Sequence, residues 1–169
     1  ENGWKASGDE ATAEERAAAW VRGAEQGFCV ALYEAGRCYV YGIGHAVELE
    51  KGLAFLRRSA ELGHYGAMAE LALALEEGRG STTKDDEQAL AWMRRAAEGG
   101  NAFAQMRLGF RQEHGNGVPQ DLAAARASYL AASEGGNENG MLNASALLAL
   151  GLGGPVDLVG AANEALAAG

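Results

Sequence analysis

The sequence predicts an all-α fold, a right-handed superhelical solenoid of antiparallel helix pairs, on two observations. The first is a helix end of the form Ala/Ser-Glu-x-Gly, whose final glycines lie 36 or 37 residues apart, at Gly27, Gly63, Gly100 and Gly136. The second is that each interval holds two stretches of helical length with apolar residues three and four positions apart. A fixed period of this size is typical of stacked supersecondary units, each of which buries its apolar face on its neighbours.

Each unit is predicted to contain a first and a second helix, with a glycine pair between them. The glycine pairs keep the same period: Gly42 and Gly44, Gly78 and Gly80, Gly115 and Gly117, and Gly151 and Gly153. In one first helix the inward stripe is Ala104, Leu108 and Gln112, and in the preceding second helix it is Ala89, Trp92, Met93, Ala96 and Ala97. Both stripes have the period of an amphipathic α-helix.

The ends of the second helices carry their own signals. Acidic residues open them, at Asp85 and Asp86, Asp121 and Asp157, where a carboxylate can cap free amides. A glycine closes each one, because glycine adopts the left-handed conformation without steric cost. Small residues recur at fixed points and allow the helices to approach closely: Ala24, Ala60, Ala97 and Ser133 in the second helices, and Gly36, Ala72, Gly109 and Ser145 in the first.

We therefore expect residues 1–169 to form a single solenoid domain. Residues 1–27 are predicted to be a partial repeat with only its second helix, at about Ala13 to Glu25. Residues 28–63, 64–100 and 101–136 are full repeats, and residues 137–169 are a degenerate repeat or cap. Whether the last segment, 155–169, forms an ordered helix is left open by the sequence, because its aromatic positions are replaced by Glu164 and Ala165.

Composition excludes several function classes. A hydrophobic content of 48% provides for a buried core, and the net charge of -9 comes without any cluster of Lys and Arg that could neutralise phosphates. We expect no nucleic-acid partner and no membrane insertion, since the longest apolar run, 141–154, is too short and is interrupted by Asn and Gly. The acidic charge favours a partner protein with a basic surface.

No catalytic or metal-binding pattern is recognisable. Cys29 and Cys38 lie nine residues apart on one helix, too far for a disulfide, and are expected to be free thiols without a catalytic role. The three histidines, His45, His64 and His114, lack the spacing of metal ligands. We expect no enzyme activity, cofactor or metal, and an inter-helix turn for GRGSTTK at 78–84.

These residues resemble the Sel-one-like repeat family, relatives of the tetratricopeptide repeat. The unit at 102–136 matches the family pattern at Ala104, Leu108, Gly109, Gly115, Gly117, Val118, Pro119, Asp121, Ala125, Tyr129 and Ala132, and departs from it at Gln112. The resemblance implies a bacterial protein-protein interaction scaffold, such as an adaptor or regulator. It also implies two alternatives: an immunity-type protein that neutralises a secreted toxin, and, less favoured, an enzyme that binds cell-wall or β-lactam compounds.

The outward side of the first helices is the candidate binding surface. In solenoids of this kind the first helices line the concave side, and arginine and aromatic residues are typical anchors at protein interfaces. The predicted partner-binding strip is Tyr33, Glu34, Arg37, Tyr41, Glu70, Leu73, Glu77, Arg107, Phe110 and His114.

The remaining expectations concern assembly and compartment. We expect a monomer or a weak homo-oligomer, with residues 138–169 as the candidate self-association end. The chain opens at Glu1 without methionine, as it would after removal of a leader or tag. The compartment stays open on this basis, with the periplasm slightly favoured over the cytoplasm.

Overall fold

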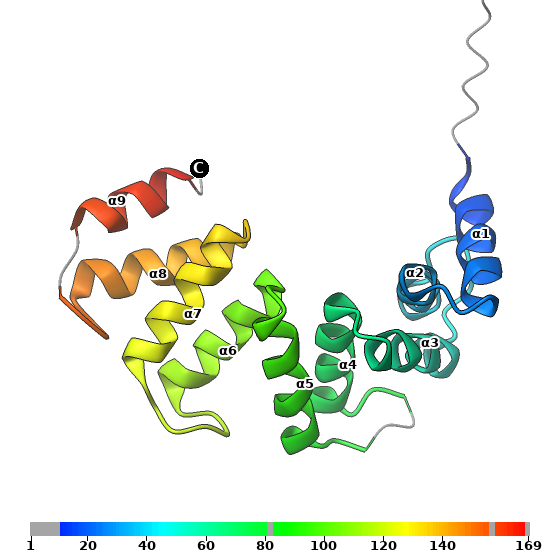
Figure 1. Cartoon of the computed structure of the whole chain (residues 1–169), viewed down its shortest axis with the longest axis horizontal. Helices are drawn as coiled ribbons and strands as arrows, with labels where there is room; N and C mark the ends of the chain where they lie inside the picture. The colour runs from blue at the N-terminus through cyan, green and yellow to red at the C-terminus, as the bar shows by residue number, and fades with distance from the viewer. Residues whose placement is uncertain (1–10, 81–82, 156–157, 168–169) are drawn as a thin grey trace, which may run out of the picture.

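The computed structural model describes residues 11–80, 83–155 and 158–167, and within these ranges the regular secondary structure consists of nine helices and no strand. The helices follow one another along a curved path, so that the protein is a crescent with α1 near one tip and α9 near the other (Figure 1). Their bounds are α1 Ala13–Glu25, α2 Cys29–Tyr41, α3 Leu49–Glu61, α4 Tyr65–Glu77, α5 Asp86–Glu98, α6 Ala102–His114, α7 Leu122–Glu134, α8 Glu138–Leu150 and α9 Leu158–Ala167. This confirms the predicted all-α solenoid of repeats.

The helices reproduce the period of the sequence. Each of α1 to α8 is 13 residues long, and residues 36 or 37 apart occupy equivalent places in every other helix. The first helices are α2, α4, α6 and α8, and the second helices are α1, α3, α5, α7 and α9. The predicted N-terminal second helix at Ala13 to Glu25 is α1.

Glycine terminates every helix from α1 to α8. First helices end at Gly42, Gly78, Gly115 and Gly151, each with left-handed backbone angles. The chain turns at Gly27, Gly63, Gly100 and Gly136 after the second helices, again with positive φ. Among the described residues, every positive φ belongs to a glycine. The two predicted breaks in each repeat are therefore confirmed, and their cause is the low cost of left-handed backbone for glycine.

The N-terminal caps predicted for α5 and α7 are confirmed. Asp85 and Asp121 accept hydrogen bonds from the backbone N–H groups of Gln88 and Ala124, at 2.8 and 2.9 Å, while Asp86 lies in the first turn. Asp157 lies outside the described residues. The sequence did not predict the caps of the first helices, which are Asn101, Asn137 and His64.

His64 makes the stability of the protein sensitive to pH. Its Nδ1 accepts from the N–H of Ala67 at 3.2 Å, which requires an unprotonated nitrogen. Burial lowers the pKa of His64 below its ordinary value of 6.5, although the nearby Glu34 opposes this. Since the folded-state pKa lies below the unfolded one, the stabilisation is complete above about pH 6.5 and is lost as pH falls from there toward the folded-state pKa.

We expect the His64→Asn variant to lose less stability on acidification than the parent protein. Asparagine occupies the equivalent position in two other repeats, caps the helix and does not titrate. Denaturant unfolding at about pH 7 and about pH 5 should show an extra loss on the order of 1 kcal/mol in the parent, the typical worth of a cap. Equal losses in the two proteins would contradict this assignment.

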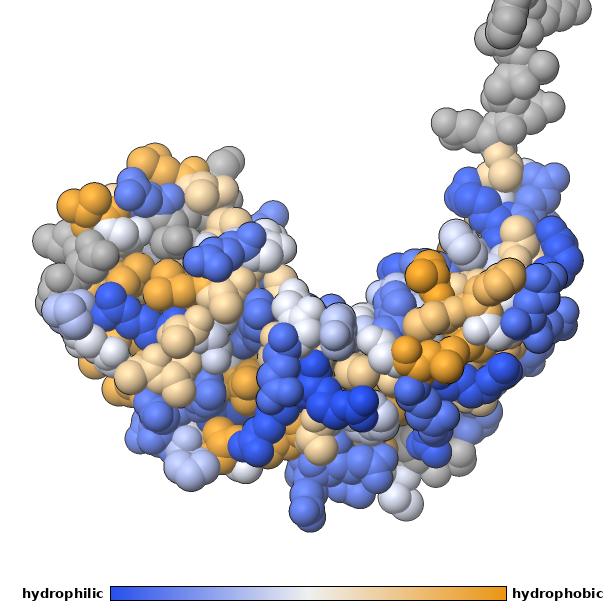
Figure 2. Space-filling view, viewed as in Figure 1, coloured by the Kyte–Doolittle hydropathy of each residue, from blue (hydrophilic) through white to orange (hydrophobic). Residues whose placement is uncertain are grey.

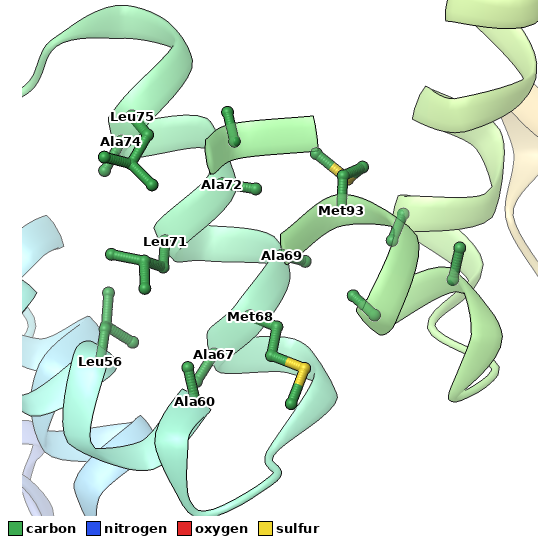
Figure 3. Packing of buried hydrophobic residues seen from close by; sticks show 14 of the residues in the cluster. Leu56, Ala60, Ala67, Met68, Ala69, Leu71, Ala72, Ala74, Leu75 and Met93 are labelled. Carbon is green, nitrogen blue, oxygen red and sulfur yellow. The ribbon is translucent and has the colours of Figure 1, made fainter. Parts of the chain in front are cut away.

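The core is a layer of small and medium apolar residues between the two rows of helices. Its largest cluster joins α3, α4 and α5, where alanines of α4 pack between Leu56 of α3 and Met93 of α5 (Figure 3). Leu56, Met68, Leu71 and Met93 are each at most 2% exposed. Of the predicted inward stripe of α5, Trp92 is half-buried and the other four residues are buried. In α6 Ala104 is fully buried, and Leu108 and Gln112 are half-buried.

Small residues set the distance between paired helices, as predicted. A Cβ added at Gly36 would lie 3.1 Å from the backbone oxygen of Gly52 and 2.8 Å from Leu56, so α2 and α3 cross almost backbone to backbone. In the third repeat, a Cβ at Gly109 would lie 2.8 Å from the ring of Tyr129. Any larger side chain at these points would separate the pair.

The two tips of the crescent differ from the interior repeats, and at the N-terminal tip a position that is buried elsewhere is exposed. Trp20 of α1 occupies the position of Leu56, Met93 and Tyr129, which are fully buried, yet Trp20 is 39% exposed because no first helix precedes α1 in the described residues. At the other tip, α9 packs on α8 through Ala161, whose carbonyl accepts a hydrogen bond from Ser145. The question left open by the sequence is thus answered: residues 158–167 form a helix.

Candidate partner-binding surface

Three successive first helices share one hollow. Its volume is about 250 Å³, and we call it the Glu70 hollow. The residues that line it come from α2, α4 and the start of α6: Tyr33, Tyr41, Gly66, Ala69, Glu70, Leu73, Asn101 and Phe103. In the space-filling view the molecule is deeply hollowed between its two arms (Figure 2). Four residues of the predicted strip, Tyr33, Tyr41, Glu70 and Leu73, lie in this hollow.

Hydrogen bonding and stacking fix the polar side chains of the Glu70 hollow. The Tyr41 hydroxyl donates to Oε2 of Glu70 at 2.6 Å, and burial, followed by this contact, raises the pKa of Tyr41. Tyr33 stacks on His64 with ring centroids 4.3 Å apart, and burial raises its pKa as well. Both tyrosines therefore stay protonated at neutral pH, and the carboxylate of Glu70 is the charged group that lines the hollow.

A second hollow, of about 410 Å³, lies farther along the crescent and contains two more residues of the strip, Arg107 and Phe110. It is also lined by Glu76, whose side chain is 9% exposed and accepts from the guanidinium groups of Arg107 and Arg111, each at 2.5 Å. In the predicted strip Arg107 is an exposed interface anchor. In the structure it is instead ion-paired within the protein, because α4 places Glu76, which it shares with Arg111, beside it from the preceding repeat.

The other residues of the strip are engaged with close neighbours. Glu34 pairs with Arg37 at 3.6 Å, and Arg37 lies over the ring of Tyr33. Glu77 pairs with Arg79 at 2.5 Å, and His114 stacks on Phe110 with centroids 4.3 Å apart. The strip thus divides into two hollows with local pairs around them. Its role in partner binding stays a prediction.

Sequence reasoning missed four residues of the Glu70 hollow: Gly66, Ala69, Asn101 and Phe103. Gly66 and Ala69 are small, so they contribute space instead of side chains. Asn101 and Phe103 lie at the start of α6, one turn before the positions chosen from the helix face. Phe103 carried a usable signal, since the position equivalent to this exposed aromatic residue in the preceding repeat is Gly66, which has no side chain to fill the space.

The two thiols have different surroundings. Burial raises the pKa of Cys38, the opposite of what a nucleophilic cysteine requires. Cys29 lies against Ser59, whose hydroxyl donates to the carbonyl of Cys29 at 2.8 Å, so this contact joins α2 to α3. Both cysteines are free, as predicted. In the part of the chain that the structure describes, no group of three His, Cys, Asp or Glu side chains is placed to hold a metal ion.

Among the helices of the described residues, none has the length and apolar character that a bilayer crossing requires.

Stacked helix pairs with an open inner face define a helical-repeat protein of the solenoid class. The Sel1 repeat model matches three segments, residues 29–64, 66–101 and 102–137, which together make up more than half of the chain. The chain therefore belongs to the Sel1 repeat family. Proteins with this fold are typically non-enzymatic scaffolds for protein interaction.

Solved structures give the same assignment. A Sel1 repeat protein from Oxalobacter formigenes is 30% identical with a TM-score of 0.86, over 92% of this chain and 45% of that one. A protective antigen present in uropathogenic Escherichia coli strains, which displays an SLR fold, is 24% identical with a TM-score of 0.80, over 93% of this chain and 33% of that one. The chain thus spans less than half the length of each. No curated protein matches the sequence.

An immunity protein from Pseudomonas aeruginosa is more distant. It is 19% identical with a TM-score of 0.46, over 83% of this chain and 65% of that one. A likeness at this level does not support an inference about function.

Proposed function

We propose that the protein is an adaptor-type scaffold that binds a partner protein on the inner face of the crescent, through α2, α4 and α6. The observation that carries the proposal is the Glu70 hollow, which three successive first helices build together. Exposed aromatic side chains at its edge, Tyr41 and Phe103, are 47% and 36% exposed and are of the type that anchors protein interfaces.

Charge supports a partner with a basic surface. The net charge of -9 attracts cationic proteins and accelerates their encounter at low ionic strength. The positive charge on the inner face is partly balanced, since Arg37, Arg79, Arg107 and Arg111 pair with three glutamates, Glu76 being shared by Arg107 and Arg111. A basic partner therefore meets reduced electrostatic repulsion there.

Site-specific photo-crosslinking tests this proposal. A photoreactive residue placed at Leu73 or Phe110, on the first helices, should crosslink a discrete protein in a lysate of cells that make the native protein. The matched control positions are Arg57 and Ala91, which are exposed on the second helices α3 and α5. Crosslinking to the same protein from the second helices alone would overturn the assignment of the face.

A further inference from the structure

Among the described residues, the carboxylate of Glu70 differs from its neighbours on the inner face in forming no ion pair. Glu34, Glu76 and Glu77 each form an ion pair. Among the described residues no basic side chain lies within ion-pair distance of Glu70, which accepts only the neutral hydroxyl of Tyr41. The guanidinium of Arg79 contacts both that hydroxyl and Glu77, the latter at 2.5 Å.

The surroundings of Glu70 suit a cationic side chain with a flat head. Glu70 is half-buried, and no Lys or Arg is among the residues that line its hollow. Tyr41 and Phe103 present partly exposed rings, while Leu73 adds an apolar contact. A guanidinium group stacks on aromatic rings and donates hydrogen bonds to a carboxylate at the same time, which an ammonium group does less well.

Size restricts the ligand further. A volume of about 250 Å³ is below the range of about 300–1,000 Å³ that is typical of small-molecule pockets. The absence of large side chains at Gly66 and Ala69 keeps this space open. The hollow therefore fits one long side chain of a partner better than a cofactor or a drug-sized molecule.

We propose that the Glu70 hollow is an arginine-binding pocket, which receives one arginine side chain of the partner protein. The guanidinium donates to the free carboxylate oxygen of Glu70 and stacks against Tyr41 and Phe103, with its aliphatic part on Leu73. This inference rests on the proposed function, because the arginine belongs to a protein partner. It identifies the partner residue that enters the hollow as an arginine.

The repeat register indicates that this pocket occurs once in the described repeats. The positions equivalent to Glu70 are Glu34, Arg107 and Asn143. Arg107 and Asn143 lack the acidic charge, and Glu34 already pairs with Arg37. Glu87→Gln is the control for Glu70→Gln: it is the same substitution, at an exposed position of the second helix α5 that does not line the hollow.

The test uses the full chain, labelled with ¹⁵N, and two blocked amino acids as probes. N-acetyl-arginine amide should produce saturable chemical-shift changes at the amides around Tyr41, Glu70 and Phe103, with millimolar affinity. N-acetyl-citrulline amide has nearly the same shape without the charge and should produce none. Glu70→Gln should weaken arginine binding about tenfold or more, since the contact joins two charged groups, whereas Glu87→Gln should leave it unchanged.

Several results would overturn the pocket. These are the absence of saturation with arginine, equal binding of citrulline, and equal affinity in the Glu70→Gln variant. Phe103→Ala should weaken binding several-fold, and an unchanged affinity would show that ring stacking plays no part. The spectrum of each variant also reports whether its fold is intact.

Failure of this inference is distinguishable from failure of the proposed function. If Leu73 and Phe110 crosslink a partner but Glu70→Gln and the parent protein bind the arginine probe alike, the scaffold proposal stands and the pocket does not. If the probe binds as expected but the crosslinks come only from the second helices, the pocket stands and the proposed binding face does not.

Discussion

The Gly44→Ala variant is expected to lose about 2–4 kcal/mol of unfolding free energy, through strained backbone and steric overlap together. Gly44 has a φ of +68°, which alanine adopts only with strain, and an added Cβ would overlap the backbone carbonyl of Ala13 at the start of α1. The loop after α2 would have to move away from α1. Urea unfolding followed by circular dichroism gives the free-energy difference.

Gly63→Ala is the matched control for this substitution. Gly63 also has a positive φ, of +96°, but an added Cβ would meet no atom within 4 Å. The control should therefore lose only the backbone cost, about 1 kcal/mol. If the two variants are equally destabilised, close approach between the repeats is not what requires glycine at position 44.

Removal of the Glu76 carboxylate should have the second large effect. Glu76→Ala leaves Arg107 and Arg111 without their shared counter-charge, and the side chain of Arg111 is only 11% exposed. Breaking a buried ion pair by removing one partner typically costs about 3–5 kcal/mol, because the remaining charge stays desolvated. We expect a loss in the lower part of that range, since Arg107, at 36% exposure, can recover water.

The neighbouring Glu77→Ala substitution provides the control. Glu77 pairs with Arg79 at the surface, where its side chain is 51% exposed, so its loss should cost less than about 1 kcal/mol. Both variants are measured by urea unfolding at neutral pH. A Glu76→Ala variant as stable as Glu77→Ala would mean that the carboxylate does not join α4 to α6.

The fold was predictable because two features of the sequence recur with the same period, the glycines and the apolar positions. Gly27 and Gly63 place the ends of the second helices, and Gly42 and Gly78 place those of the first, so the helices between them have little freedom in length. Even the incomplete repeat follows this logic: α1, Ala13–Glu25, was placed by sequence alone.

The candidate site was predictable only in part, because a helix face identifies exposed residues but not their partners. The contact of Arg107 with Glu76 joins residues 31 positions apart, and that of Tyr41 with Glu70 joins residues 29 apart. Such contacts depend on how one repeat is rotated against the next. The sequence pattern does not predict that rotation. The same rotation brings Phe103 to the Glu70 hollow.

The first-helix caps were missed for a related reason. His64, Asn101 and Asn137 follow the glycine turn directly, where a polar residue is also typical of an ordinary loop. Only the backbone geometry shows that each side chain accepts a hydrogen bond from the third residue after it. Phe28 holds the same position before α2 and makes no side-chain cap, so the residue type alone does not define the role.

Excision of one whole repeat tests most directly that the units stack in register around an open inner face. Deletion of residues 64–100 removes α4 and α5 and joins Gly63 to Asn101, so one helix-capping residue replaces another at the junction. In a solenoid each repeat contacts only its neighbours, so the shortened chain should keep its mean helicity per residue and unfold cooperatively at lower stability. Loss of most of the helical circular-dichroism signal would contradict the account, because it would mean that the helices share one indivisible core.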